Sequence, residues 1–507
     1  MDFDGFKAHA ASAGLVPVWR DVLLDRDTPV SVFAKLRRGG FGFLLESAPA
    51  GSETWSRYTF MGTEPRAARA LSDGIVSDWS PSKGWHAERR VSDPLADLER
   101  LVMQFPPASV PELGAFWGGA VGYLGYDVVR AIESLPHAPV KNLNIPDALF
   151  VFTRGLVVID NFRSQGRVIV SVPVPRSADE YTLRALYDEA CSELDAIADR
   201  LLESSPLEPL VLGAPTRASV GVSSYEHDKF IEDVACIKEY IRAGDVFQCL
   251  LARRIDVAHD FDSADLYRAL RALNPSPYMY HLDLDGTELV GCSPELLVRL
   301  ANRQVTVRPI AGTRPRGSTP AADEQMTADL LGDEKERAEH VMLVDLGRND
   351  VGRIAEYGSV AVSDFMCVEK YSHVLHIVSQ VDGRVRGDVG FADVLRATFP
   401  AGTMTGAPKV RAMQIIDELE PERRGAYAGA VGYIAWGGER IDLAITIRTC
   451  VISNGIASAQ AGAGIVADSV PEMEWLETEN KARAVLTAIA QVRDAKIASS
   501  HSMHPVG

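Results

Sequence analysis

The sequence predicts a globular chain that mixes α-helices and β-strands, and three observations lead to this prediction. With 46% hydrophobic and 24% charged residues, the composition excludes a disordered, collagen-like or disulfide-scaffold chain. Alternating or continuous apolar runs are typical of strands, and other segments repeat apolar residues at the helical period. The length of 507 residues is enough for a large core, and it allows about two to four domains.

The N-terminal half begins with strands and ends in a long helix. We expect strands over 41–45, 115–124, 149–160 and 168–174, and helices over 93–105 and 177–203. Residues 204–219, SSPLEPLVLGAPTRAS, contain three prolines and no clear period, which predicts a linker. The expected organisation is therefore an N-terminal domain over 1–203, the linker, a second domain over 220–492 and a flexible tail over 493–507.

The C-terminal half mixes strands with longer helices. We expect helices over 225–243, 263–273, 323–347, 407–419 and 472–494, and strands over 289–300, 304–309, 427–435 and 443–451. The N-terminus lacks the pattern of a signal peptide, and no run of 18 apolar residues occurs. The six cysteines form no CxxC pair, as expected for reduced thiols. Together these features predict a soluble cytoplasmic protein.

The net charge of −17 argues against a nucleic-acid or anionic-membrane binder, although a local cluster of Arg and Lys can still bind an anionic small molecule. Two helical segments carry acidic residues three positions apart, Glu336 with Glu339 and Glu474 with Glu477, followed by Lys481. On the pattern alone these are two solvated acidic faces, or carboxylates that converge on a hard cation such as Mg²⁺.

The surrounding text favours the second interpretation. Nine segments carry this information: LLES (44–47), RYTF (57–60), GGAVGYLGYD (118–127), PIAGTRPRG (309–317), LLGDEKERAEHVMLVDLGRND (330–350), YSHVLHIVSQVDG (371–383), FPAGTMTGAPK (399–409), IRT (447–449) and AGAGIVADSVPEMEWLETENKA (461–482). By these motifs the chain resembles the chorismate-utilising enzymes, and within them the anthranilate synthase large subunits, strongly over about 220–490 and more weakly before that.

The resemblance implies an α+β fold in which two large, mostly antiparallel β-sheets pack as a sandwich with flanking helices. It also implies a chemistry: chorismate binds with Mg²⁺, ammonia adds at C2, the C4 hydroxyl leaves, and elimination of pyruvate gives anthranilate. This reaction is the first committed step of tryptophan biosynthesis. Each step builds or moves negative charge, which a fixed cation stabilises.

The resemblance also assigns roles to individual residues. Glu339 and Glu477 match the metal ligands, while Glu336 and Glu474 match carboxylates around the metal waters. The residues that match the substrate-binding positions are Gly312, Thr313, Tyr427, Arg448, Gly462, Ala463, Gly464 and Lys481. The residues expected to serve catalysis are Glu295 as the acid for the departing C4 hydroxyl, His376 for the elimination of pyruvate, Thr403 as a donor, and Gln248.

Two positions distinguish members of the family. Members that add water place a Lys where this chain has Gln248, and Gln cannot accept a proton at neutral pH. Aminodeoxychorismate synthases read PIKGT with a nucleophilic Lys, whereas Ala311 cannot form a covalent adduct. No cysteine lies in a G-x-C-x-G elbow, so we expect a separate glutamine amidotransferase subunit to supply ammonia.

A regulatory site is a second implication of the resemblance. LLES and NPSPYM resemble tryptophan-feedback motifs, so Ser47, Pro277, Tyr278 and Met279 are expected to line a pocket for the inhibitor tryptophan. The plainer interpretation is a core strand end and a turn after a helix. Two other functions stay open: an aminodeoxychorismate synthase, and a tryptophan-binding subunit without activity. The intact set of Glu339, Glu477, Arg448 and His376 argues against the inactive subunit.

Overall fold

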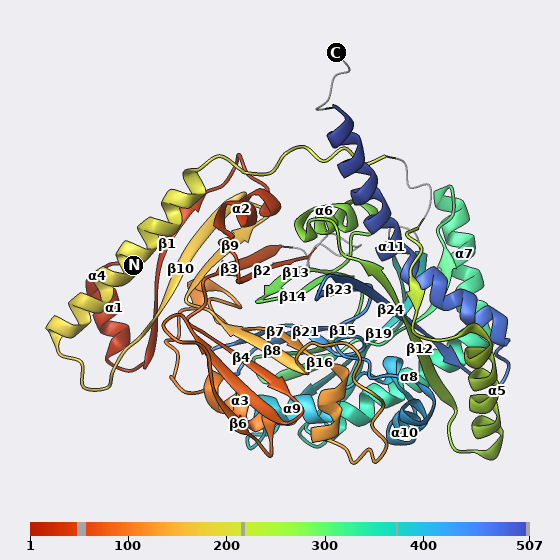
Figure 1. Ribbon diagram of the computed structural model, residues 1–507. Helices are drawn as coiled ribbons and strands as arrows, with labels where there is room; N and C mark the ends of the chain where they lie inside the picture. Colours follow the sequence, from red (N-terminus) through yellow and green to blue (C-terminus); the bar gives the residue numbers. More distant parts are fainter. Residues whose placement is uncertain (48–56, 214–217, 372–373, 503–507) are drawn as a thin grey trace.

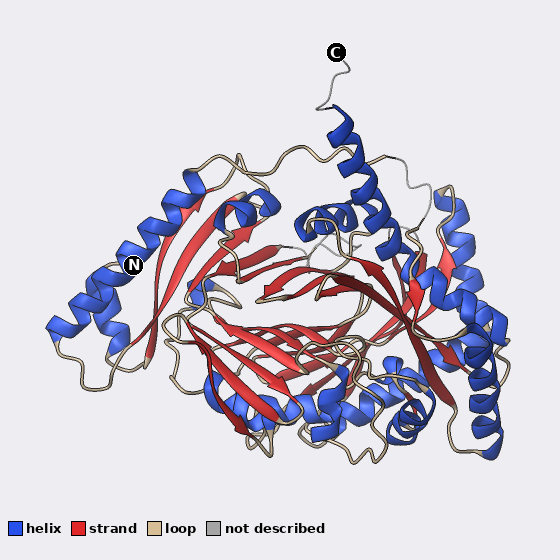
Figure 2. Ribbon diagram, viewed as in Figure 1, coloured by secondary structure: helices blue, strands red, loops and turns tan. Residues whose placement is uncertain are grey.

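Two large β-sheets lie face to face in the computed structural model, and helices cover their outer faces (Figures 1 and 2). The structure describes residues 1–47, 57–213, 218–371 and 374–502, with side chains as far as residue 496. Within these residues each sheet has twelve strands, and neighbouring strands run antiparallel. The expected α+β sandwich is therefore confirmed.

We name the sheets A and B. Sheet A contains, in spatial order, β1 (Leu15–Leu23), β10 (Gln165–Pro173), β9 (Gly155–Asp160), β3 (Tyr58–Thr63), β2 (Phe41–Glu46), β13 (Tyr278–Leu284), β14 (Thr287–Ser293), β23 (Thr449–Ser453), β24 (Ile456–Ile465), β12 (Gln248–Ala258) and β11 (Val222–Ser223), with β20 (Gly406–Ala407) beside β12. Sheet B contains β17 (Ile310–Pro315), β19 (Val374–Arg384), β16 (Gln304–Val307), β15 (Leu296–Ala301), β22 (Ile441–Ile445), β21 (Ala430–Ala435), β7 (Gly119–Leu124), β8 (Ala148–Phe152), β4 (Ala67–Ser72), β5 (Ile75–Ser80) and β6 (Gly84–Arg90), with β18 (Ala361–Lys370) beside β19.

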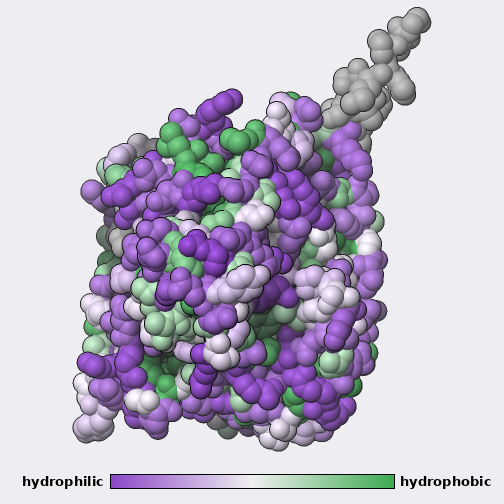
Figure 3. Space-filling view, turned by 90° about the vertical axis from the view of Figure 1, so that its left-hand side faces the viewer, coloured by the Kyte–Doolittle hydropathy of each residue, from purple (hydrophilic) through white to green (hydrophobic). Residues whose placement is uncertain are grey.

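The α-helices are α1 (Phe3–Ala10), α2 (Pro29–Leu36), α3 (Pro94–Val102), α4 (Glu180–Leu202), α5 (His227–Ala243), α6 (Ser263–Leu273), α7 (Pro320–Gly332), α8 (Glu334–Gly352), α9 (Phe391–Thr398), α10 (Lys409–Leu419) and α11 (Pro471–Ser502). Short 3₁₀ helices are η1 (Pro111–Leu113), η2 (Tyr126–Ala131) and η3 (Gly402–Met404). None of the described helices combines the length and apolarity that a membrane crossing requires. The face that Figure 3 turns to the viewer is mostly hydrophilic, with scattered apolar patches, as is usual for a protein surface.

Strands from both sides of residues 204–219 pair within both sheets. In sheet A, β2 pairs with β13, and in sheet B, β7 pairs with β21. Each sheet therefore draws its strands from both halves of the chain. The division into two domains at 204–219 stays a prediction. Phe60, Phe116 and Tyr433 contact one another between strands of the two sheets, with centroids 4.2 to 5.6 Å apart.

Three segments that we expected to be single strands cross from one sheet to the other. One is 149–160, which leaves sheet B after Phe152 and enters sheet A at Gly155; the other two form the pair of crossovers described next. The segment 289–300 leaves sheet A after Ser293 and enters sheet B at Leu296, so Glu295 lies in the crossover. The segment 443–451 leaves sheet B after Ile445 and enters sheet A at Thr449. The Ile445 N–H donates to the Glu295 carbonyl at 3.0 Å, so the two crossovers lie side by side.

Two expected helix ranges also differ. The segment 323–347 contains parts of two helices, because Asp333 has an extended backbone and its carboxylate accepts from the Lys335 and Glu336 N–H groups at 3.0 and 3.2 Å. This is an N-cap that starts a new helix. At the C-terminus, α11 continues to Ser502 and so runs through much of the segment in which we expected a tail.

Candidate active site

One cavity of about 910 Å³ opens where the chain crosses between the sheets. Helices α8 and α11 and strands β12, β17, β19 and β24 contribute to its walls. Fifteen of the predicted catalytic, substrate-binding and metal-binding residues line it: Gln248, Glu295, Gly312, Thr313, Glu336, Glu339, His376, Thr403, Tyr427, Arg448, Gly462, Gly464, Glu474, Glu477 and Lys481. Residues scattered over more than two hundred positions are thus gathered around one space.

The acidic pairs enter this cavity from two helices. Glu336 and Glu339 belong to α8, and Glu474 and Glu477 belong to α11. Burial raises the pKa of Glu339, and the Glu336 carboxylate raises it further. Burial likewise raises the pKa of Glu474, and Glu477 adds to the effect. Carboxylates that disfavour each other's charge in this way favour a bound cation.

The start of α8 is fixed against strand β17. Arg314 of β17 bonds through Nη2 to Asp333, the N-cap of α8, at 2.7 Å, and through Nη1 to Glu336 at 3.3 Å. Because the cap and the first-turn carboxylate share one guanidinium, the acidic face of α8 is held toward the cavity.

Gln248, the first residue of β12, joins that strand to α8. Its Nε2 donates to Glu339 Oε1 at 3.1 Å, while its Oε1 is buried with no partner among the described residues. A Cβ at Gly464 would lie 2.5 Å from Gln248 Nε2, so glycine leaves the space that the carboxamide fills. The carboxamide therefore offers a free acceptor beside a metal-ligand candidate.

Glu295 lies in the crossover between β14 and β15 and is 7% exposed. Burial raises its pKa to about 7, although a hydrogen bond from Thr403 and the charge of Arg448 lower it. The Thr403 Oγ1 donates to Glu295 Oε1 at 3.1 Å. A carboxyl with this pKa is partly protonated at neutral pH and can act as a general acid.

His376 of β19 lies with its Nδ1 2.9 Å from the Gly312 carbonyl oxygen and 3.2 Å from Thr313 Oγ1. Because a carbonyl only accepts, Nδ1 carries the proton and Nε2 keeps its lone pair. Burial lowers the pKa of His376 to about 4. Gly312 presents this carbonyl from a left-handed backbone, with φ of 67°, which favours glycine.

The cavity walls also carry cationic groups. Lys481 Nζ bonds to Glu477 at 2.7 Å and to the Gly462 carbonyl at 2.9 Å. Arg448 lies in the second crossover with φ of 50°, and Tyr427 lies buried beside the same cavity. Ala463 differs, since strand alternation turns its fully buried side chain into the apolar cluster beneath α5. A role for Ala463 therefore rests on its backbone.

The residues predicted for tryptophan lie outside this cavity. Strand β2 pairs with β13 in the register Glu46 to Met279, which places Ser47 at the end of β2 next to Tyr278. The structure thus brings the two effector motifs together on two neighbouring strands in the middle of sheet A. The preceding residues, Asn274 to Ser276, line the catalytic cavity.

Several cavity residues were not predicted. They include Lys335, Tyr371, Asn480 and Arg483. Lys335 and Asn480 lie within motifs that the sequence analysis singled out. Each is next to a predicted site residue, Glu336 or Lys481, and this proximity could have indicated them. Tyr371 is the first residue of another of these motifs, 371–383, and its ring packs edge-on against His376 at 5.3 Å.

The donor set of the cavity fits Mg²⁺. No three or more His, Cys, Asp or Glu side chains are arranged to hold a metal by themselves within the described ranges. Mg²⁺ takes one or two protein carboxylates, keeps several waters and completes its shell with an anionic ligand. Two pairs of carboxylates facing one anion-sized cavity match this requirement.

Comparisons with known proteins show what the chain is similar to. A model of chorismate binding enzymes matches residues 58–487. The chain is 45% identical over 491 residues to anthranilate synthase component 1 of Acinetobacter calcoaceticus, covering 94% of this chain and 96% of that one. It is 41% identical over 499 residues to anthranilate synthase component 1 of Acetivibrio thermocellus, covering 97% and 99%.

Solved structures are similar as well. The crystal structure of anthranilate synthase component I from Streptococcus pneumoniae matches with a TM-score of 0.75 and 34% identity, covering 92% of this chain and 99% of that one. The menaquinone-specific isochorismate synthase of Escherichia coli matches with a TM-score of 0.69 at 19% identity, covering 96% and 98%, and this likeness concerns the fold alone.

Proposed function

The chain belongs to the chorismate binding enzyme family, and on that premise we propose that it converts chorismate and ammonia to anthranilate and pyruvate, as the large component of an anthranilate synthase. The observation that carries this choice is the identity of two cavity residues. Gln248 and Ala311 both line the cavity. Family members that add water have a lysine at the position of Gln248, and aminodeoxychorismate synthases, which form a 4-amino product, have a lysine at the position of Ala311. Neither side chain can serve as a base or a nucleophile.

Substrate binding follows from the charges of the walls. The ring carboxylate of chorismate would bind Mg²⁺ held by Glu339 and Glu477, with Glu336 and Glu474 around the metal waters. The metal would stabilise negative charge at that carboxylate. Arg448, Tyr427 and the N–H groups beside Gly462 and Gly464 would bind the enolpyruvyl carboxylate.

The first step is the addition of ammonia. The nitrogen lone pair attacks C2, the ring double bonds shift, and the C4–O bond breaks. Glu295 gives its proton to the departing oxygen, which leaves as water. Gln248 Oε1, which is buried and has no hydrogen-bond partner in the described part of the chain, accepts an N–H of ammonia and turns the nitrogen lone pair toward the ring.

The second step is the elimination of pyruvate. The Nε2 of His376 takes the proton from C2, the C3–O bond breaks, and the enolpyruvyl group leaves to become pyruvate. Because burial keeps the pKa of His376 at about 4, the imidazole is neutral and able to accept this proton at neutral pH. The ring becomes aromatic, which drives the step forward.

A direct assay tests the proposal. The purified chain is mixed with chorismate, Mg²⁺ and ammonium at alkaline pH, and anthranilate is followed by its fluorescence. We expect product without any partner subunit, and folded protein that yields none would overturn the proposal. Chromatography with mass detection distinguishes anthranilate from the 4-amino product of an aminodeoxychorismate synthase. If the chain is instead a tryptophan-binding subunit without activity, it should bind tryptophan and form no product.

We also propose that the cytoplasmic enzyme obtains ammonia from a glutamine amidotransferase subunit. Glutamine should replace ammonium only after that subunit is added. Tryptophan should inhibit by binding beside Ser47, Pro277, Tyr278 and Met279. Ser47→Leu should leave turnover unchanged and remove inhibition, whereas a variant still inhibited at the original tryptophan concentration would place the effector site elsewhere.

A further inference from the structure

Arg424 lies beneath the catalytic cavity, in the loop between α10 and β21, and is 2% exposed. It forms a two-pronged ion pair with Glu420, which is 5% exposed, through Nε to Oε2 at 2.9 Å and Nη2 to Oε1 at 2.6 Å. Taking such a pair out of water is costly, and an apolar pair of similar volume is often at least as stable. The pair therefore calls for an explanation other than stability.

The remaining donors of Arg424 point to two walls of the cavity. Its Nη1 donates to the Met404 carbonyl at 2.7 Å, and its Nη2 donates to the Leu250 carbonyl at 3.2 Å. Glu420 Oε1 in turn accepts the N–H of Ala252 at 2.9 Å. Leu250 and Met404 both line the cavity. One buried ion pair thus connects strand β12 with the 3₁₀ turn η3.

The turn η3 carries the partner of the proposed acid. Thr403 immediately precedes Met404, and its hydroxyl donates to Glu295 at 3.1 Å. A displacement of η3 would therefore change this hydrogen bond. The planar guanidinium fixes the Met404 carbonyl, the Leu250 carbonyl and the Glu420 carboxylate in one geometry, which a flexible ammonium cannot do.

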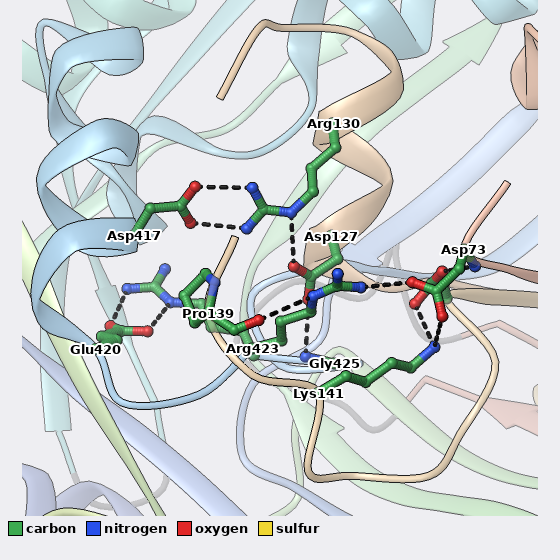
Figure 4. A network of polar contacts seen from close by, with 11 residues as sticks. Asp73, Asp127, Arg130, Pro139, Lys141, Asp417, Glu420, Arg423 and Gly425 are labelled. Carbon is green, nitrogen blue, oxygen red and sulfur yellow. Dashed lines mark hydrogen bonds and ion pairs between the residues drawn. The ribbon is translucent and has the colours of Figure 1, made fainter. Parts of the chain in front are cut away.

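The loop itself has other anchors, which Figure 4 shows. Arg423 bonds to Asp73 at 2.8 Å and to the Pro139 carbonyl at 3.2 Å. The Gly425 N–H donates to Asp127 at 3.3 Å. These contacts anchor the loop on its outer side. The loop therefore does not depend on Arg424 alone, and the inward hydrogen bonds of Arg424 can position the cavity walls.

We propose that Arg424, oriented by Glu420, is a positioning residue that holds η3 so that Thr403 keeps its hydrogen bond to Glu295. The proposal rests on the proposed role of Glu295 as the general acid. Glu295 is faced by the Ile310 N–H from β17, by Arg448 from the second crossover and by Lys481 from α11; the Tyr371 phenol, just before β19, also feels its charge. None of these groups is a contact of Arg424, so they stay in place when it is replaced.

The test is a pH profile of two variants. The double variant Glu420→Met with Arg424→Met removes both charges, and Arg424→Lys keeps one charge without the fork. The profile of kcat/KM for chorismate is measured with free ammonia held constant at each pH. Losing the Thr403 hydrogen bond removes an influence that lowers the pKa of Glu295. The high-pH decline of activity should therefore move to higher pH, with a loss of about 10²-fold in kcat/KM, as for other small displacements of catalytic groups.

Two reference variants make the result specific. Thr403→Val should move the decline in the same direction. Lys35→Met with Asp27→Asn removes a partly buried pair in and beside α2, at 2.9 Å, whose residues are not among those that line the cavity. This variant should lower thermal stability but leave the high-pH decline of kcat/KM at the wild-type pH. If the double variant does not fold, Arg424→Lys carries the test.

A decline at the wild-type pH in Arg424→Lys would overturn the proposal. A crystal structure of that variant with Thr403 still bonded to Glu295 would also overturn it, whatever the activity. Absence of anthranilate from the wild-type chain would instead contradict the proposed function, so the two failures are distinguishable.

Discussion

The Gln248 carboxamide donates a hydrogen bond of 3.1 Å to Glu339, and this contact joins the first residue of β12 to the acidic face of α8. It fixes which end of the carboxamide faces the cavity, since the NH₂ group is taken by the carboxylate. The oxygen is left as a buried acceptor. In the proposed mechanism, ammonia and the metal ion would therefore lie next to each other, on either end of one carboxamide.

Replacing Gln248 with Leu should weaken the use of ammonia. Leucine has nearly the same volume but neither donates to Glu339 nor accepts from ammonia. We expect kcat/KM for ammonia to fall by about 10-fold to 10²-fold, the scale of one lost hydrogen bond to a charged or reacting group. Steady-state kinetics with varied ammonium checks this. An unchanged KM and kcat for ammonia would show that the acceptor is not used.

Gly464→Ala should reproduce part of that defect without removing a polar group. The added Cβ would lie 2.5 Å from Gln248 Nε2, so the carboxamide must move. Gly455→Ala is no control, because its φ of 76° strains any side chain. Gly352→Ala is better, since a Cβ there meets nothing within 4 Å. Equal kinetics in Gly464→Ala and Gly352→Ala would contradict this packing argument.

The pH dependence of the first step follows from Glu295. Its pKa is raised to about 7, and the acid must be protonated to act. Activity at constant free ammonia should therefore decline above about pH 7, tenfold per unit. Glu295→Gln should lose about 10²-fold to 10⁴-fold in rate, the range for general acids. A pH-independent rate between pH 6 and pH 9 would remove Glu295 from this role.

His376→Ala should separate the two steps. Addition of ammonia does not need the imidazole, whereas removal of the C2 proton does. We expect anthranilate formation to fall and the aminated intermediate, still carrying its enolpyruvyl group, to accumulate. Mass spectrometry of the quenched reaction identifies it. The wild-type enzyme should show no decline at low pH from this group above about pH 5, because its pKa is about 4. Unreacted chorismate as the sole detected species would contradict the assignment.

Residue spacing and resemblance to a family predicted different parts of the fold and of the candidate site. Spacing alone places Glu336 and Glu339 on one helix face, but cannot bring them to Glu474 and Glu477, which lie on a helix more than a hundred residues away. That convergence came from resemblance to a family, and the cavity is compatible with it. Periodicity predicted most of the described helices but fewer than half of the described strands; β12, β13, β19 and β24, which lie near the cavity, were not expected.

The crossovers were beyond periodicity. The segment 289–300 has an apolar run on each side of Glu295, since it is buried in sheet A and then in sheet B, and an apolar run does not say to which sheet it belongs. Pro294 was the local sign that the strand stops there. The cap at Asp333 was also readable, as Asp is favoured before a helix, but the helical period continues across it.

The central claim is that carboxylates from α8 and α11 hold one divalent ion in the cavity. Crystals grown with chorismate and Mn²⁺ in place of Mg²⁺, measured at a wavelength where manganese scatters anomalously, test it most directly. We predict one anomalous peak in contact with both Glu339 and Glu477, which disappears in Glu477→Gln. A peak bound by only one helix, or no peak in the cavity, would contradict the account.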